Sequence, residues 1–261
     1  GIGVRGLTYM HVPLTAWGPR ALNHLLYARL GWNPDEDHEP LIAEYFQRWY
    51  GPHAAALREV YRRLEEAWLF VASWRMWGPH SFLTQIAKWD GQKPAAPLAL
   101  DNHFGSAPEA LRKGRESLRL MDEALKELDA AREKQKREFV PGAAAVPAAR
   151  NPAELEAARL KCGPDRLFLR LAEDRRAVVY GRDTMGLMTA VLDYYEARRL
   201  DDPARGERAW GEVEGYAEAL DQYVVPFTYS STPGVEARDG LTRSQLRTVV
   251  ERCRFHRNTD A

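Results

Sequence analysis

Three acidic side chains lie close together near residue 35, where a pair of carboxylates could serve acid–base chemistry. Asp35, Asp37 and Glu39 follow an Asn-Pro break and precede an apolar pattern of helical period. Glycosidases hold two carboxyl groups on opposite sides of a scissile bond, whereas these acids are neighbours in the chain. Acids at a helix N-terminus are stabilised by the helix dipole and by unpaired N–H groups. We therefore expect them to begin a helix, and we assign no catalytic residue to this stretch.

Other motifs of metal and covalent chemistry are absent from the sequence. The seven histidines are scattered, and no H-E-x-x-H, Cys/His cluster, G-x-S-x-G, P-loop or Rossmann fingerprint occurs. Asp101 and His103 flank Asn102 in a Gly/Pro-rich stretch, where Asp and Asn usually form turns. An unrecognised enzyme site in residues 77–108 would depend on these two side chains. Cys162 and Cys253 are too few for a disulfide framework and are expected to be inert thiols. We expect no metal and no cofactor.

The tryptophans are concentrated in the first third of the chain, with seven of the eight at or before residue 89. Trp49 and Trp68 fall on the apolar stripes of predicted helices, so we expect both in the core. Trp17 differs because it follows a predicted strand, next to Gly18 and Pro19. Loops beyond strand ends commonly carry binding sites, and aromatic rings are large amphipathic contact surfaces. Trp17 is therefore a candidate to face a ligand.

Composition narrows the classes of partner. The chain has 261 residues, 45% of them hydrophobic, which suits one large or two small domains. Lys+Arg and Asp+Glu both number 37, so no basic charge excess favours nucleic acid or an anionic membrane surface. No apolar run approaches the roughly 20 residues that span a bilayer. The first residue is glycine rather than methionine, so we expect a processed product or a piece of a longer protein.

Hydrophobic periodicity predicts a mainly α fold. Residues 2–12 are the one convincing strand, and a lone strand must find its hydrogen-bond partners elsewhere. Residues 139–150 are rich in proline and alanine, which predicts a linker between two helical parts. A further feature is an apolar seam on a long helix starting near Ser106, with the spacing of a coiled coil; it consists of Leu111, Leu118, Met121, Leu125 and Leu128. The predicted helices cover about 19–31, 35–50, 52–71, 106–138, 153–199 with a break at 163–164, 204–223 and 242–256.

Three stretches in this order resemble a known family. They are VRGLTYMHV, WGPRALNHLLYARLGWNPD and LIAEYFQRWYGPHAAALREVYRRLEEA, within residues 2–70. They are similar to the junction between the last strand of a (β/α)8 barrel and the helical C-terminal region in bacterial glycoside-hydrolase-like proteins. The named family is the alpha-glucuronidase-like domain-of-unknown-function family, in which a helix closes on a Y-Y-G-x-A-like signature. Here that signature is Trp49-Tyr50-Gly51-Pro52-His53-Ala54.

The resemblance implies a fold, a domain order and a ligand class. The fold is a helical bundle that follows the last strand and helix of a (β/α)8 barrel. It implies barrel residues at 1–31, a first helical part at 32–138, the linker at 139–150 and a second helical part at 151–261. The implied partners are a carbohydrate ligand and an upstream barrel domain of the same protein. Independently of the resemblance, the charge balance and the lack of a long apolar run predict no nucleic-acid and no membrane partner. The catalytic carboxylates would lie on earlier strands, outside this chain.

The resemblance implies a ligand-binding role for two residues of this chain. The catalytic face of a barrel lies at the C-terminal ends of its strands, where His11 and Trp17 would stand. Trp17 would stack on a sugar and His11 would bond a hydroxyl or carboxylate, although a purely structural role for His11 stays open. The chain would then support the barrel and border its sugar-binding cleft. The alternative is a non-catalytic helical module for protein interaction or oligomerisation, with the seam at 111–128 as its surface.

Overall fold

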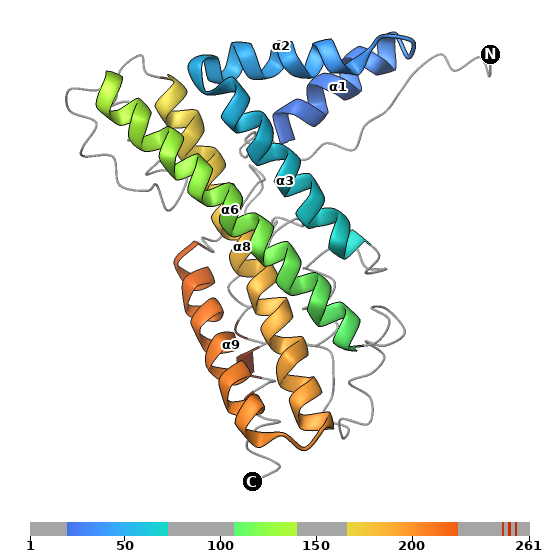
Figure 1. Ribbon diagram of the computed structural model, residues 1–261, viewed down its shortest axis with the longest axis vertical. Coiled ribbons are helices and arrows are strands. Elements are labelled where there is room, and N and C mark those ends of the chain that lie inside the picture. Colours follow the sequence, from blue (N-terminus) through green and yellow to red (C-terminus); the bar gives the residue numbers. More distant parts are fainter. Residues whose placement is uncertain are drawn as a thin grey trace, which may run out of the picture. The chain divides into compact units, whose positions relative to one another are not determined.

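The protein is mainly helical in the part that its computed structural model describes. That part comprises residues 20–72, 107–139 and 166–223, with residues 247, 250, 251 and 254. No strand occurs among these residues (Figure 1). The elements are α1 (Arg20–Trp32), α2 (His38–Tyr50), the short 3-10 helix η1 (Gly51–His53), α3 (Ala54–Ala72), α6 (Ala107–Phe139), α8 (Arg166–Arg199) and α9 (Pro203–Tyr223).

Local signals set the helix ends in the N-terminal part. Asp37 is the N-cap of α2, and its carboxylate accepts a 3.0 Å hydrogen bond from the Glu39 N–H. The prediction that these acids begin a helix is confirmed for Asp37 and Glu39, whereas Asp35 lies in the turn before α2. Gly51 ends α2 with φ +48°, a conformation that side chains with a Cβ rarely adopt. Pro52 then starts the next turn, where its missing N–H does no harm.

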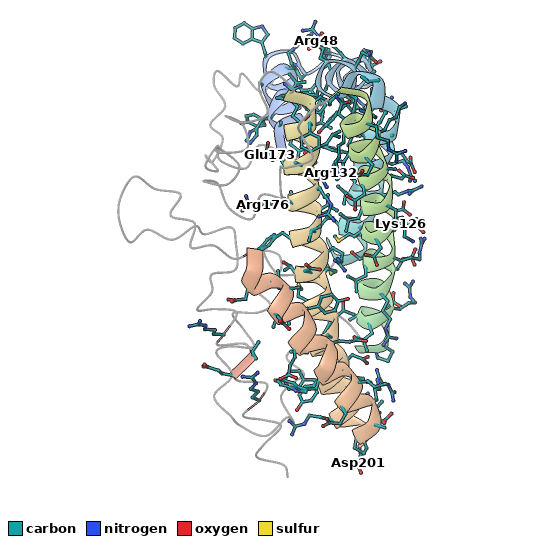
Figure 2. The ribbon with its side chains drawn as sticks, turned by 90° about the vertical axis from the view of Figure 1, so that its left-hand side faces the viewer. Arg48, Lys126, Arg132, Glu173, Arg176 and Asp201 are labelled. Atoms are coloured by element: carbon teal, nitrogen blue, oxygen red, sulfur yellow. The ribbon has the colours of Figure 1, made fainter. Side chains whose placement is uncertain are left out.

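A tight turn joins the last two long helices. Asp201 adopts φ +54° there, which aspartate tolerates better than most residues, and it lies at the tip of the turn (Figure 2). The Asp202 carboxylate accepts a 3.0 Å hydrogen bond from the Arg205 N–H and so caps α9. The Asp202 N–H in turn donates to the Ala197 carbonyl at 2.9 Å, which closes the end of α8. The turn thus fixes the reversal of the chain with two short-range hydrogen bonds of Asp202.

The described helices belong to two compact units. The first unit comprises residues 1–61 and 127–177, and the second comprises residues 62–126 and 178–261. In the first unit, α2 and the start of α3 bury one apolar face each, as their sequence periodicity predicts. Parts of α6 and α8 complete this core. Its buried side chains include Leu41, Tyr45, Phe46, Tyr50, Leu57, Val60, Leu128, Ala131, Phe168 and Leu171.

In the second unit, α8 lies between α6 and α9 (Figure 1). Residues 183–197 of α8 are buried on almost every side, with Asp193 alone half-buried. A helix that is covered all round is the centre of its unit. Aromatic contacts join it to α9, where the rings of Tyr194 and Trp210 lie 5.7 Å apart. The other core residues include Leu111, Leu120, Met121, Met185, Leu187, Met188, Val191, Val213 and Leu220.

Several sequence predictions can be compared with these helices. The helices predicted at 19–31, 52–71, 106–138 and 204–223 are confirmed within one or two residues, and the helix predicted at 35–50 begins three residues later, at His38. The prediction that Trp68 lies in the core is wrong, because 40% of it is exposed. A ring atom of Trp68 lies close to the α8 backbone at Gly181, but this neighbour leaves much of the side chain uncovered. The predicted strand at 2–12 and the linker at 139–150 lie outside the described residues, and the domain boundaries stay predictions.

Candidate functional site

The residues to which the sequence assigns a ligand lie outside the described part of the chain. These are His11 and Trp17, and also Asp101 and His103 of the alternative loop site. The acids near residue 35 do lie inside it. Glu39 pairs with Arg58 at 2.5 Å, and Glu36 pairs with Arg29. Both pairs are on the surface: the first joins the start of α2 to α3, and the second joins α1 to the turn that follows it, which gives these acids an architectural use.

The main polar cluster of the described residues is buried in the first unit, where α2, α3 and α8 meet. Asp174 of α8 is 2% exposed. Its Oδ2 accepts a 2.6 Å hydrogen bond from the Tyr50 hydroxyl. Its Oδ1 lies 3.5 Å from the Tyr61 hydroxyl, at the long limit for a hydrogen bond. The two tyrosine hydroxyls are 2.7 Å apart. A carboxyl group thus lies inside an apolar core with two phenols as its neighbours.

The two tyrosine hydroxyls together give the Asp174 carboxylate only one good hydrogen bond. A tyrosine hydroxyl has one proton to donate. Because Tyr50 donates its proton to Asp174, Tyr61 must donate in the 2.7 Å contact with Tyr50. The 3.5 Å contact from Tyr61 to Oδ1 therefore adds little. One carboxylate oxygen has a good donor and the other does not, which is an unfavourable setting for a buried negative charge.

Burial is the main cause of the pKa shifts here. It raises the pKa of Asp174 from 3.8 to about 7, although the hydrogen bond from Tyr50 and the positive charge of Arg170 act in the opposite direction. The charge of Glu173 adds to the increase. Burial also raises the pKa of Tyr45 to about 12, and it raises the pKa of Tyr50, with the negative charge of Asp174 as the second cause. The phenols are therefore neutral donors at every physiological pH.

Arg170 connects this cluster to the family-like signature. Its guanidinium lies 3.8 Å from the centre of the Trp49 ring and donates a 2.8 Å hydrogen bond to the Trp49 carbonyl. Trp49 was predicted to lie in the core; it is half-buried, with this cation on its face. A cation–π contact of this kind contributes about 0.5–2 kcal/mol. The carbonyl at the C-terminal end of α2 also favours a positive charge.

A second buried contact involves the histidine of the same signature. His53 is 4% exposed, and its Nε2 lies 3.0 Å from Oε1 of Gln135 on α6. Nearby on α6, the Arg132 guanidinium lies 5.7 Å from the ring centre of Phe168 on α8 (Figure 2). The signature 49–54 therefore contacts α6 through His53 and α8 through Tyr50 and Trp49. Its polar atoms are used inside the unit rather than presented to a ligand.

This arrangement can hold a proton but offers no route to a substrate. Catalytic groups need access to the reacting atoms, and the carboxyl group of Asp174 is enclosed by aromatic rings. Among the described residues, no group of three or more His, Cys, Asp or Glu side chains could hold a metal ion. Within the same residues, no helix is long and apolar enough to cross a membrane. The cluster is thus a buried carboxyl group whose pKa is raised to about 7 by burial.

Sequence reasoning missed Asp174. Its position within Leu171-Ala172-Glu173-Asp174-Arg175 resembles an ordinary charged helix surface, and its partners are more than 100 residues away in the chain. The apolar and polar residues of α8 do not separate into two distinct faces, so no local signal marked the burial of this carboxyl group. Comparisons with protein-family models, with curated proteins and with solved structures find no match to this chain.

Proposed function

We propose that this chain is the helical C-terminal portion of a glycoside-hydrolase-like enzyme, in which it supports a preceding (β/α)8 barrel and borders the sugar-binding cleft. The order of the three family-like stretches motivates the proposal. One feature of the described helices supports it, namely the incomplete burial of α1. In the proposed assembly, α1 is the last helix of the barrel, and such helices cover the outside of the barrel strands.

The apolar face of α1 is less buried than those of its neighbours. Its four leucines are all half-buried, and Ala21 is the one buried residue of the helix. By contrast, Leu57 and Val60 on α3 are fully buried. An amphipathic helix obtains most of its stability from packing its apolar face. A barrel surface would supply the missing cover; the leucines concerned are Leu22, Leu25, Leu26 and Leu30.

The oligomerisation alternative has less support. It depends on the seam at 111–128 as a surface for a partner. Leu111, Met121 and Leu128 are at most 2% exposed, and Leu125 is 9% exposed. Leu118 is half-buried. The seam is thus used within the chain, and a partner helix could not reach it without opening the core.

The α1 surface gives the first test. Replacing both Leu22 and Leu26 by serine should destabilise the full-length gene product more than the isolated 261-residue chain, by about 2 kcal/mol from the lost apolar contact. The free energy of unfolding is measured in urea for both proteins. Asn23→Ser combined with Ala28→Ser, at exposed positions of the same helix, is the matched control. An equal loss in both proteins would show that the chain covers this face itself and would contradict the proposal. So would a native mass of 29.7 kDa, which leaves no room for a barrel.

Sugar binding gives the second test. In the full-length protein, Trp17→Ala should weaken binding of glucuronic-acid-bearing or N-acetylglucosamine oligosaccharides by about tenfold or more, which corresponds to about 1.4 kcal/mol of stacking. His11→Ala should have a smaller effect. Trp32→Ala is the control, because Trp32 is 92% exposed and has no assigned role. Titration calorimetry measures the affinity. Unchanged binding by a folded Trp17→Ala variant would remove Trp17 from the site.

A further inference from the structure

The second unit contains a pocket of about 520 Å³ between α6, α8 and α9. That volume is within the range of small-molecule sites, about 300–1,000 Å³. All three helices line it: Arg115 comes from α6, Arg182 and Asp183 from α8, and Glu212 and Tyr216 from α9. The polar groups therefore converge from elements that are far apart in the sequence.

Two glycines shape the pocket in opposite ways. At Gly186 of α8, a Cβ would overlap the ring of Tyr216, so the glycine lets this ring lie directly against the α8 backbone. At Gly215 of α9, a Cβ would have no neighbour within 4 Å. Gly215 also lines the pocket. The close approach at the first glycine and the missing side chain at the second leave a hollow between otherwise packed helices.

The charges around the pocket compensate one another. Arg115 lies 2.9 Å from Asp193, which also accepts a 2.7 Å hydrogen bond from Arg205. Arg182 lies 2.9 Å from Asp183. The lining itself has two arginines and three carboxylates, and Arg205, which lies outside the lining, pairs with Asp193. This balance gives no electrostatic advantage to an anion over a neutral ligand.

Three lining groups still have hydrogen-bonding capacity. Arg182 Nε is buried without a hydrogen-bond partner, because its contact with Asp183 lacks hydrogen-bond geometry. Within the described residues, neither the Tyr216 hydroxyl nor the Glu212 carboxylate has a hydrogen-bond partner. The pocket therefore offers a donor, an acceptor and a group that is both. A ligand hydroxyl can donate to Glu212 and accept from Arg182, whereas an ammonium only donates and a carboxylate only accepts.

We propose that this pocket binds a neutral polyhydroxylated ligand of monosaccharide or disaccharide size. The buried Arg182 N–H carries the argument, because a buried donor without a partner is costly and a bound hydroxyl would satisfy it. Tyr216 and Glu212 would bond further hydroxyls at the open side of the pocket. This site does not depend on the proposed function, since it lies entirely on α6, α8 and α9.

A steric block with a matched control tests the site. The probes are cellobiose, xylobiose and maltose as neutral sugars, with glucosamine, glucuronate and glutamine as charged or zwitterionic comparators. Saturation-transfer NMR measures their binding to the 261-residue chain. We expect at least one neutral sugar to bind and Gly215→Leu to abolish that binding by filling the pocket. Gly211→Leu should leave it unchanged, because Gly211 has equally open space on the same helix but does not line the pocket.

Polar variants then test the chemistry. Glu212→Gln and Tyr216→Phe should each weaken binding by about three- to tenfold, the cost of one hydrogen bond. Glu218→Gln, on the exposed side of α9, should not. The proposal fails if no neutral sugar binds at millimolar concentration, if only a charged or zwitterionic probe binds, or if Gly215→Leu, shown to be folded by circular dichroism, keeps the affinity of the unmodified chain.

Discussion

Replacing Asp174 by asparagine should remove a pH dependence from the stability of this protein. The folded-state pKa of Asp174 is about 7, against 3.8 for an ordinary aspartate. Between these two values the folded state holds a proton that the unfolded state has released. The free energy of unfolding should therefore fall as the pH rises from 5 towards 7, and then level off. At about 1.4 kcal/mol for each unit of pKa, the loss between pH 5 and 8 is about 2–3 kcal/mol.

The Asp174→Asn variant isolates this contribution. Asparagine has nearly the same shape, and its Oδ1 can still accept the hydrogen bond from Tyr50. It has no charge to bury, so we expect the variant to be more stable than the unmodified protein at pH 8. At pH 5 the two should differ little. Urea unfolding followed by circular dichroism at both pH values measures the difference.

An exposed aspartate provides the control for this experiment. Asp35→Asn changes the same groups at the surface, in the turn before α2, and should leave the pH dependence as it was. If the Asp174→Asn variant kept the full pH dependence, another group would be responsible. If it were less stable at pH 8, the charge of Asp174 would be better solvated than one good hydrogen bond implies.

Gly186→Ala should destabilise the second unit, although alanine favours helices. A Cβ at position 186 would overlap three ring atoms of Tyr216. Position 186 is buried in the middle of the central helix, so the α8 backbone cannot move away freely from the ring. Overpacking of this kind costs about 1–3 kcal/mol, which exceeds the roughly 1 kcal/mol that alanine gains over glycine within a helix. Thermal and urea unfolding measure the net loss.

A glycine-to-alanine substitution on α9 should instead raise the free energy of unfolding. At Gly211 of α9 a Cβ meets nothing within 4 Å, so Gly211→Ala should stabilise the protein by about 0.5–1 kcal/mol. In addition, Gly186→Ala should lower the free energy of unfolding by a smaller amount when Tyr216 is replaced by leucine, because the two residues are in direct contact. A stabilising Gly186→Ala would mean that the Tyr216 ring can move aside, and that the close approach does not hold α8 against α9.

The sequence by itself determined where the described helices begin and end. Asp37 caps α2, Gly51 closes it, and Pro203 follows the turn before α9. Each of these signals acts within about four residues, because capping and turn formation satisfy backbone groups of the same turn. The acids near residue 35 could be assigned to a helix start for the same reason. Periodicity also indicated the apolar faces of α2 and α3.

Only the tertiary structure decided what covers those faces. Periodicity predicted the same burial for the leucines of α1 as for those of α3, yet the former are half-buried, whereas Leu57 and Leu64 of α3 are buried. Trp68 occupies a stripe position and is 40% exposed, whereas Asp174 resembles a surface residue and is 2% exposed. A sequence pattern specifies which side of a helix is apolar. The depth of burial, and with it the pKa of a carboxyl group or the presence of a pocket, depends on residues that are distant in the chain.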